Sequence, residues 1–452
     1  MAGWDVIVVG AGPAGEVVAG RLGEAGGVSV ALVERELVGG ECAYWACMPS
    51  KALLRPGDLL AETRRVGGVR ELVDEARPDA RAVLVRRDEV IHGLDDSGQL
   101  PWLEERGVTV LRGAARLDGE RRVRVGEELH TARRAVVLAT GSGAAVPPIP
   151  GLADVRPWTN REGTTAQEVP ARLIVVGGGV VGSELAQAWR SLGSEVTLVE
   201  ALPRLLGREE PFAAKMVRDS LERHGVDVRL GVEATGARRE DADVVLSLAG
   251  GAEVRGDEIL VAVGRRPHTD ELGLETVGLE PGRIVEVDDE MRVADRPWLF
   301  AVGDVNGRAL VTHQGKHQGR IVADLILGRP ARDRAPVPRV VFTDPQVAAV
   351  GHTLESAEAA GLRVRAVDHP PGAVAGASFV GRGEGSLARI VIDEERGVLV
   401  GVTFCGPEVA ELLHAATIAV AAAVPLADLW QAVPAFPTRS EVWLRLLEKA
   451  GL

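Results

Sequence analysis

Two of the three cysteines of this 452-residue chain, Cys42 and Cys47, lie five positions apart. The segment around them, residues 39–51, has the sequence GGECAYWACMPSK and holds the only tyrosine of the chain, Tyr44. Three cysteines in a chain of this size do not make a secreted disulfide framework, and a close pair is more typical of catalysis. A nucleophilic cysteine must be a thiolate, which a cation or a helix N-terminus stabilises. Lys51 and a helix that begins after Pro49 could supply both, so the segment predicts a redox-active cysteine pair.

An alternative is that the two cysteines are buried and inert, because unpaired cysteine often packs as a small hydrophobic residue. The third cysteine, Cys405, lies in an apolar segment far from the pair in sequence, and we expect it to be of this inert kind.

The cysteine segment lies between two glycine-rich loops, and the first loop completes a dinucleotide-binding pattern. Its parts are a strand at 5–9, the glycines Gly10, Gly12 and Gly15, a helix at 16–25, and a strand at 28–33 followed by Glu34. The glycines allow a tight turn, a close approach of the backbone to a pyrophosphate, and close packing of helix on strand. An acid about twenty residues after the glycines can accept hydrogen bonds from a ribose.

The same pattern returns in the second loop. Its parts are a strand at 173–176, the glycines Gly177, Gly179 and Gly182, a helix at 183–192, and a strand at 195–199 followed by Glu200. A carboxylate at this position favours a free 2′-hydroxyl over a 2′-phosphate, which predicts NADH. Arg204 lies nearby in sequence, so use of NADPH stays open.

These patterns predict an α/β protein with two Rossmann-type dinucleotide-binding domains and a C-terminal α+β module. Apolar strands that end in glycine, at 136–141 and 259–264, close the two nucleotide domains, and a further strand at 298–304 ends in an acid. After residue 330 short alternating strands and helices at 408–422 and 440–450 are expected. The predicted boundaries are residues 1–146 with 265–330 for the first domain, 147–264 for the second, and 331–452 for the third.

Composition narrows the possible partners. The net charge of −13 argues against nucleic acid and anionic membranes, which bind clustered Lys and Arg. The longest apolar stretch, residues 415–424, is too short to span a bilayer. No secretory signal is visible at the N-terminus, so a cytoplasmic protein is predicted.

Taken together, the motifs resemble those of the flavoprotein disulfide reductases, a family that includes dihydrolipoamide dehydrogenase, mercuric reductase and glutathione reductase. The matching segments are GAGPAG at 10–15, GGxCxxxxCxPSK at 39–51, ATG at 139–141, GGGVVGSELA at 177–186, VGRRP at 263–267 and AVGD at 301–304. They occur in the family's order over nearly the whole chain.

The resemblance implies FAD in the first domain, NAD(P)H in the second, and a homodimer formed through the third. It implies that Cys47 faces the flavin as the charge-transfer thiolate and that Cys42 exchanges with the substrate. It implies that Lys51 and Glu184 lie beside the flavin and nicotinamide rings and that Asp304 binds the ribityl chain. The other cofactor-contacting positions that it implies are Gly40, Thr140, Gly141, Gly264 and Gly303.

The C-terminal motif departs from the family. Family members usually carry HPTxxE, whose histidine is the acid–base for the thiols and comes from the partner subunit. In this chain Thr438 and Glu441 keep the register, but Phe436 occupies the histidine position. A phenyl ring cannot transfer a proton. A general acid–base typically raises the rate of such a reaction by about 10²–10⁴-fold. Other conceivable bases are Glu441 itself, Tyr44, His313, His317 and His414.

The cysteine loop also departs from the family. Glu41 replaces a common threonine near the FAD pyrophosphate and adds a negative charge. Tyr44 and Trp45 could form an apolar stacking pocket with Phe436, or Trp45 could simply pack beneath the flavin domain. The metal domain and C-terminal cysteine pair of mercuric reductases are missing from the sequence, so no metal site and no mercury reduction are predicted.

Three functions follow as hypotheses. The first is an NAD(P)H- and FAD-dependent reductase that passes electrons through Cys42 and Cys47 to a disulfide-type acceptor. The second is an NAD(P)H:quinone reductase in which electrons leave the flavin directly, as the aromatic residues Phe436, Tyr44 and Trp45 suggest. The third is a redox-sensing flavoprotein whose cysteine state controls a partner.

Overall fold

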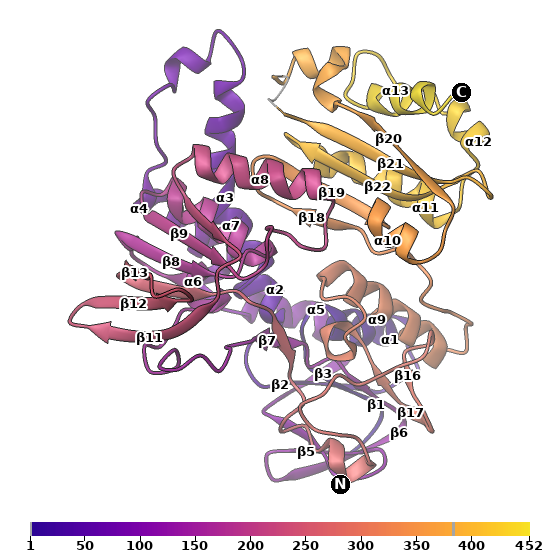
Figure 1. Cartoon of the computed structure of the whole chain (residues 1–452). Coiled ribbons are helices and arrows are strands. Elements are labelled where there is room, and N and C mark those ends of the chain that lie inside the picture. Colours follow the sequence, from indigo (N-terminus) through magenta and orange to yellow (C-terminus); the bar gives the residue numbers. More distant parts are fainter. Residues whose placement is uncertain (1, 382–384) are drawn as a thin grey trace. The chain divides into compact units, whose positions relative to one another are not determined.

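The computed structural model (Figure 1) describes residues 2–381 and 385–452. The chain divides into two units. The first unit consists of Met1–Pro49, Arg87–Ala145 and Gly264–Arg334. The second consists of Ser50–Arg86, Val146–Val263 and Ala335–Leu452. Helices α3 (Cys47–Arg64) and α4 (Ala80–Val90) each have residues in both units.

The first unit is built on an eight-stranded sheet. Its main path runs in the order β16 (Arg292–Val293), β17 (Arg296–Ala301), β6 (Glu128–Leu138), β1 (Ala2–Val9), β2 (Val30–Glu34) and β3 (Val108–Arg112). The central strands are parallel, and the side chains of Val6, Ile7 and Val8 are fully buried. A parallel strand covered on both faces has a continuous apolar sequence, which explains the run at 5–9.

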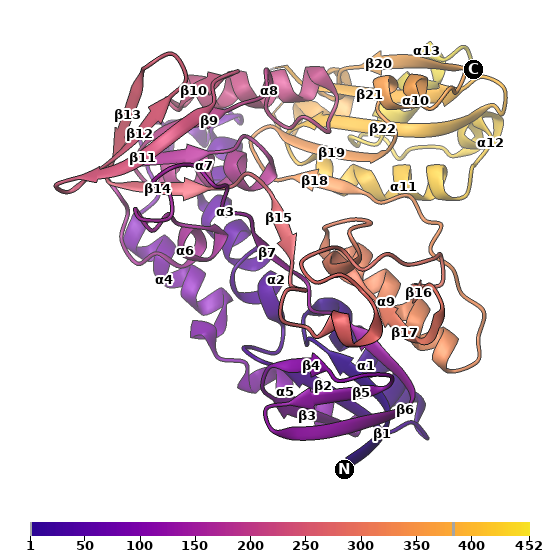
Figure 2. The same cartoon turned by 60° about the horizontal axis from the view of Figure 1, so that its bottom comes forward.

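Helices and a meander cover opposite faces of this sheet. Helices α1 (Pro13–Ala25) and α9 (Thr312–Ile326) pack on one face and lie side by side (Figures 1 and 2). Strands β4 (Ala115–Leu117) and β5 (Arg122–Val125) contribute to the core on the other face. The remaining elements are helices α2 (Gly40–Tyr44) and α5 (Leu100–Glu104) and the two-stranded ribbon of β7 (Ser142–Ala144) and β15 (Arg265–Pro267).

The second unit contains a four-stranded parallel sheet in the order β10 (Asp227–Leu230), β9 (Glu195–Glu200), β8 (Arg172–Val176) and β14 (Glu258–Val261). A three-stranded antiparallel sheet packs on one face, with strands β11 (Ala234–Glu240), β12 (Asp243–Leu248) and β13 (Glu253–Gly256). Helices α7 (Val180–Ser191) and α8 (Pro211–Arg223) cover the other face, and the short helix α6 is Asn160–Thr165.

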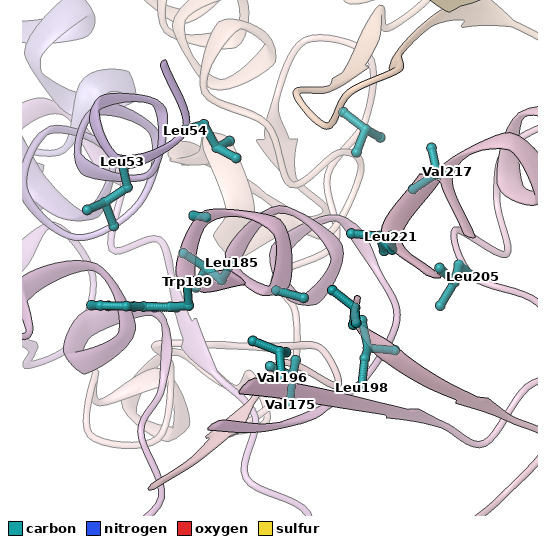
Figure 3. Packing of buried hydrophobic residues seen from close by; sticks show 14 of the residues in the cluster. Leu53, Leu54, Val175, Leu185, Trp189, Val196, Leu198, Leu205, Val217 and Leu221 are labelled. Atoms are coloured by element: carbon teal, nitrogen blue, oxygen red, sulfur yellow. The ribbon is translucent and has the colours of Figure 1, made fainter. Parts of the chain in front are cut away.

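The core around α7 connects this nucleotide fold to helix α3. Trp189 and Leu185 of α7 lie between Leu53 and Leu54 of α3 and the strand residues beneath them (Figure 3). The indole nitrogen of the fully buried Trp189 donates to the carbonyl oxygen of Gly163 at 3.0 Å. The part of helix α3 that carries Leu53 and Leu54 is thereby anchored on α7, the helix that follows the second glycine-rich loop.

The C-terminal region forms a five-stranded antiparallel sheet. Its order is β18 (Arg339–Val341), β19 (Gln346–Gly351), β22 (Val398–Gly406), β21 (Leu387–Asp393) and β20 (Val364–His369). Helices α11 (Leu413–Ala421) and α13 (Glu441–Lys449) share one core with this sheet, and α10 (Leu354–Ala359) packs in a separate cluster. Helix α12 is Leu426–Gln431.

The predicted fold class, α/β with a C-terminal α+β region, is confirmed. The helix expected at 408–422 is shorter, because residues Val409–Leu412 form a 3₁₀ turn and α11 covers only Leu413–Ala421. The C-terminal sheet lies in the same unit as the second nucleotide fold. The three domain boundaries drawn from the sequence stay a prediction. Within residues 2–381 and 385–452, every helix is too short or too polar to cross a bilayer.

Candidate active site

The first glycine-rich loop brings its backbone against the acid at the end of β2. The N–H of Ala11 donates to Oε2 of Glu34 at 2.8 Å, and the N–H of Glu36 donates to Oε1 at 2.7 Å. The turn depends on Gly10, whose φ is +102°, and on Gly15, where a Cβ would overlap the carbonyl oxygen of Gly10.

The second loop repeats this arrangement. The N–H of Gly178 donates to Oε2 of Glu200 at 2.6 Å, and the N–H of Leu202 donates to Oε1 at 2.7 Å. Arg204 is engaged elsewhere: its Nη2 donates to the carbonyl oxygen of Gly207 at 3.0 Å and lies 3.6 Å from Oε2 of Glu355.

Both loops leave room for a pyrophosphate at a helix N-terminus. Gly12 and Gly179 are the N-caps of α1 and α7, and no described side chain caps either helix. A Cβ at Gly12 or at Gly179 would meet no atom of residues 2–381 or 385–452 within 4 Å. The first N–H groups of a helix bind anions, so both cradles fit the phosphates of a dinucleotide.

Asp304 and Glu41 are connected through one arginine in the first unit. Ser142 Oγ donates to Oδ2 of Asp304 at 2.6 Å, and Arg265 Nε lies 3.5 Å from the same oxygen. The Nη2 of Arg265 also lies 4.0 Å from Oε1 of Glu41. The single positive charge of Arg265 is therefore shared by Glu41 and Asp304 and partly offsets the negative charge that Glu41 brings to the cysteine loop. In addition, the hydroxyl of Thr140 donates to the carbonyl oxygen of His268 at 3.0 Å.

Cys42 and Cys47 are adjacent, half-buried thiols that are not joined in a disulfide in the described part of the chain. Cys42 lies in α2, and Cys47 is the first residue of α3. The Sγ of Cys47 and the Oγ1 of Thr312, at the start of α9, are 3.5 Å apart in hydrogen-bond contact. The hydrogen bond with Cys47 and burial raise the pKa of the Cys42 thiol, whereas Thr312 and Lys316 act to lower it.

Cys405 differs from the pair. Its side chain is 0% exposed in β22, and burial raises the pKa of its thiol to about 12. A buried thiol of this kind is inert towards disulfides, because the thiolate is the nucleophile.

Tyr44, the last residue of α2 in the cysteine loop, is buried. It is 1% exposed, its hydroxyl donates to the carbonyl oxygen of Val38 at 3.1 Å, and its ring centroid lies 5.8 Å from that of Trp45. Burial and nearby carboxylates raise the pKa of Tyr44 to about 12. Tyr44 is therefore not available as the base that the sequence left open, and its ring packs against Trp45.

Lys51 and Glu184 form an ion pair in the second unit. Lys51 Nζ lies 2.6 Å from Oε2 of Glu184 and 4.8 Å from the centroid of the Phe342 ring. The other carboxylate oxygen, Oε1, accepts the N–H of Phe342 at 2.9 Å. The pair thus joins α3, α7 and the segment that follows β18.

Gln187, one turn after Glu184 on α7, makes a parallel set of bonds. Its Oε1 accepts the N–H of Asp344 at 2.8 Å, and its Nε2 donates to Oδ1 of Asp58 on α3 at 3.3 Å. Burial and the neighbouring Asp344 raise the pKa of Asp58 to about 7, against the opposing charges of Arg55 and Arg65. Arg65 also pairs with Asp344.

The residues of the altered C-terminal motif lie in the second unit, whereas the cysteine pair lies in the first. Phe436 is 75% exposed. Glu441, at the start of α13, is buried, and its Oε2 accepts no hydrogen bond in the described part of the chain. Among the histidines, His313 and His414 are exposed, and His317 Nε2 lies 3.8 Å from Oδ1 of Asp333.

Sequence reasoning missed Thr312, Gln187 and the pairing of Arg265 with Glu41. Thr312 is 265 positions from Cys47, so no local pattern could have linked them. Arg265 belongs to the VGRRP segment and was available as a charge partner for Glu41, but only the tertiary fold brings the two together.

Comparison with known proteins agrees with this arrangement. The sequence family described as pyridine nucleotide-disulphide oxidoreductase matches residues 4–319, and the dimerisation domain of the same class matches residues 337–446. A dihydrolipoyl dehydrogenase of Thermus scotoductus is 36% identical over 97% of this chain and 95% of its own length. A dihydrolipoyl dehydrogenase of Haloferax volcanii is 34% identical over 99% of this chain and 96% of its own length.

Solved structures show the same relationship. The HOCl-induced flavoprotein disulfide reductase RclA from Escherichia coli aligns with a TM-score of 0.86 and 26% identity over 98% of this chain and 99% of its own. LpdA from Mycobacterium tuberculosis aligns with a TM-score of 0.88 and 25% identity over the full length of both chains.

Proposed function

Because the chain belongs to the pyridine nucleotide-disulphide oxidoreductase family, and is thus an FAD-containing, NAD(P)H-dependent oxidoreductase, we propose that it reduces a disulfide-type acceptor through Cys42 and Cys47. The observation that carries this proposal is the adjacency of the two thiols, with Cys47 in contact with Thr312 at the N-terminus of α9. A dithiol of this geometry can close to a disulfide and reopen, which is the chemistry that a disulfide acceptor needs.

The nucleotide loops and their acids hold the cofactors in this proposal. FAD, when bound, supplies the electron transfer between a pyridine nucleotide and a disulfide. The N-terminus of α1 and Glu34 bind its pyrophosphate and ribose, and Asp304, held by Ser142 and Arg265, binds the ribityl chain. Lys51 and Glu184 orient the two rings, and the N-terminus of α7 with Glu200 binds the pyridine nucleotide.

The two cysteines have different roles. Cys47 lies at the N-terminus of α9, whose partial positive charge favours a thiolate. The pKa of Cys42 is raised by its neighbour and by burial, so Cys42 keeps its proton at neutral pH and needs a base before it can attack a disulfide. In this proposal Cys47, which contacts Thr312 at the start of α9, faces the flavin, and Cys42 exchanges with the acceptor.

The pyridine nucleotide is NADH in this proposal. The carboxylate of Glu200 lies against the second glycine-rich loop, where a 2′-phosphate would be repelled. Arg204, the nearest candidate to neutralise that phosphate, is turned towards Glu355 and Gly207. The matching dimerisation domain supports a homodimer.

A second candidate is an NAD(P)H:quinone reductase, in which electrons leave the flavin without passing through the cysteines. The exposed phenyl ring of Phe436 at the position of the family histidine favours it. An aromatic side chain can stack on a quinone ring, but it cannot protonate a thiolate.

Anaerobic titration with NADH and dithionite separates the two. Uptake of four electrons per FAD places the cysteine pair in the electron path, whereas uptake of two excludes it. Cys42→Ser should abolish turnover of a small disulfide while NADH still reduces the flavin, and Cys405→Ser, a buried cysteine, is the matched control. Quinone turnover that survives Cys42→Ser would identify the direct route.

A further inference from the structure

Helix α2, which carries Cys42, is docked on the first turn of α1. The N–H of Gly39 donates to the carbonyl oxygen of Ala11 at 2.8 Å, and a Cβ at Gly40 would lie 2.7 Å from the Cα of Gly12. Glu16 is one turn beyond Gly12, since its N–H donates to the Gly12 carbonyl oxygen at 3.0 Å. Residues four apart lie on one face of a helix, so Glu16 extends the α1 face on which the cysteine loop rests.

Helix α9 approaches the same turn of α1 through small residues. A Cβ at Gly319 would lie 2.7 Å from the carbonyl oxygen of Ala14, and one at Gly315 would lie 3.3 Å from the Ala14 side chain. Lys316 follows Gly315 and is four residues beyond Thr312, which contacts Cys47. The exposed ammonium group of Lys316 is thus carried by the helix whose first residue touches the thiol pair.

The positive charge of Lys316 acts on both the Cys42 thiol and the Glu16 carboxyl group. Burial raises the pKa of half-buried Glu16 to about 7, Lys316 on α9 acts to lower it, and Glu34 at the end of β2 adds to the rise. Lys316 also acts to lower the pKa of Cys42 on α2. The charge of Glu16 also contributes to the raised pKa of Tyr44 in the same loop. The charge of Lys316 therefore acts on both Glu16 and Cys42.

We propose that Glu16 is the general acid–base for the Cys42 thiol, in place of the histidine that Phe436 replaces, and that Lys316 is its positioning residue. The inference rests on the proposed disulfide-reductase function. A carboxyl group that titrates near neutral pH suits this task, because proton transfer is most effective when the pKa lies near the working pH, and one water molecule can carry the proton.

The proton balance is complete with the groups named. Glu16 carboxylate accepts the proton of the Cys42 thiol, and the resulting thiolate attacks one sulfur of the acceptor R–S–S–R′. The S–S bond breaks, a Cys42–S–R bond forms, and R′S⁻ takes the proton back from Glu16 to become R′SH. Cys47 thiolate then attacks the Cys42 sulfur, which restores the Cys42–Cys47 disulfide and releases RS⁻, protonated from solvent. The acceptor gains two electrons and the dithiol loses two.

This scheme fixes the pH dependence of the acceptor half-reaction. The active state has a single proton shared by Glu16 and Cys42, so the rate rises with pH through the Glu16 pKa and then levels. Without Glu16 the rate follows the Cys42 thiolate fraction alone. Because the pKa of Cys42 is raised, that fraction keeps rising about tenfold per pH unit without levelling.

The experiment follows NADH oxidation by the holoenzyme with a small cyclic disulfide, oxidised lipoamide, from pH 5.5 to 9. The wild type should level above pH 7. Glu16→Gln should be 10²–10⁴-fold slower at pH 7 and lose the plateau, as expected for removal of a general acid–base. Glu24→Gln, an exposed acid on the same helix, is the matched control and should behave as the wild type.

Substitution of Lys316 tests the positioning role. Lys316→Met should move the midpoint of the rate–pH profile to higher pH, because Lys316 lowers the pKa of Glu16. Lys316→Arg should restore the wild-type midpoint. Alkylation of the reduced holoenzyme by iodoacetamide gives an independent readout, since Lys316→Met should also raise the apparent pKa of Cys42.

The outcomes separate this inference from the proposed function. A wild type that takes up four electrons per FAD and turns over the disulfide, together with a Glu16→Gln variant that keeps the plateau, would overturn the role of Glu16 alone. A wild type that takes up only two electrons and reduces no disulfide would overturn both.

Discussion

The ammonium group of Lys51 lies 2.6 Å from Oε2 of Glu184, and the opposite oxygen of the same carboxylate holds the backbone N–H of Phe342 at 2.9 Å. The two partners are buried to very different degrees: the side chain of Glu184 is 2% exposed and that of Lys51 is 34% exposed. The pair therefore depends on Lys51 to neutralise a charge that water does not reach.

This asymmetry predicts unequal effects of the two neutral substitutions. Lys51→Met leaves a buried carboxylate without its cation and should lower the free energy of unfolding by about 3 kcal/mol. Glu184→Gln keeps an acceptor for the Phe342 N–H and leaves a lysine that water can reach, so a loss of about 1 kcal/mol is expected. Urea unfolding followed by tryptophan fluorescence, at a fixed excess of FAD, measures both.

A matched control for this comparison is Lys215→Met, which breaks the exposed pair with Asp219 and should cost under about 1 kcal/mol. Equal losses for Lys51→Met and Glu184→Gln would mean that burial of Glu184 does not govern the pair.

The two glycine-rich loops predict a separation between folding and cofactor binding. A Cβ at Gly15 or Gly182 would overlap a backbone carbonyl oxygen, so Gly15→Ala and Gly182→Ala should give unfolded or aggregated protein. At Gly12 and Gly179 a Cβ meets no described atom, and the backbone angles, with φ of −71° and −73°, suit alanine. These two variants should fold but bind the dinucleotide weakly.

The measurements are FAD retention after gel filtration for Gly12→Ala and the dissociation constant of NADH for Gly179→Ala. Each variant serves as the control for the other, because a defect should appear at one nucleotide and leave the second unchanged. If Gly12→Ala retained FAD as firmly as the wild type, the first loop would not hold the pyrophosphate.

Local patterns accounted for the two nucleotide folds and for few of the contacts between distant segments. Glu34 and Glu200 were predictable, because a strand, a glycine turn, a helix and a second strand follow each other within about thirty residues. The contact of Thr312 with Cys47 and the pairing of Arg265 with Glu41 join segments more than 200 positions apart. The residue type and the position of Tyr44 suggested a role in the site. Its burial depends on tertiary packing, which the periodicity of the sequence does not reveal.

Glu200 predicts the choice of pyridine nucleotide. Glu200→Gln keeps an acceptor for a backbone N–H but removes the charge that repels a 2′-phosphate. The ratio of kcat/KM for NADPH over NADH should rise about tenfold, equivalent to ~1.4 kcal/mol. Glu34→Gln makes the same change in the first fold and should leave this ratio unaltered while weakening FAD binding. An unchanged ratio in Glu200→Gln would remove this carboxylate from nucleotide selection.

Asp58 predicts how stability depends on pH. Its pKa is raised to about 7 in the folded protein, chiefly by burial and then by Asp344, against about 3.9 in an unfolded chain. Between these values the folded state binds the extra proton, so the stabilisation is complete below about pH 4 and is lost as pH rises through 7. Asp58→Asn removes this dependence and keeps an oxygen for the Gln187 amide.

We therefore expect Asp58→Asn to match the wild type near pH 4.5 and to exceed its free energy of unfolding by about 1–2 kcal/mol at pH 8, a value reduced for partial exposure to solvent. Urea midpoints measured from pH 4.5 to 8.5 test this. Asp219→Asn is the control of opposite sign, because the hydrogen bond from Lys215 lowers the pKa of Asp219 and its ionised form is the stabilising one. If the free energies of unfolding of Asp58→Asn and the wild type depended on pH in the same way, ionisation of Asp58 would cost no stability. The positive charges of Lys51, Arg55 and Arg65 would then fully balance the three carboxylates of Asp58, Glu184 and Asp344.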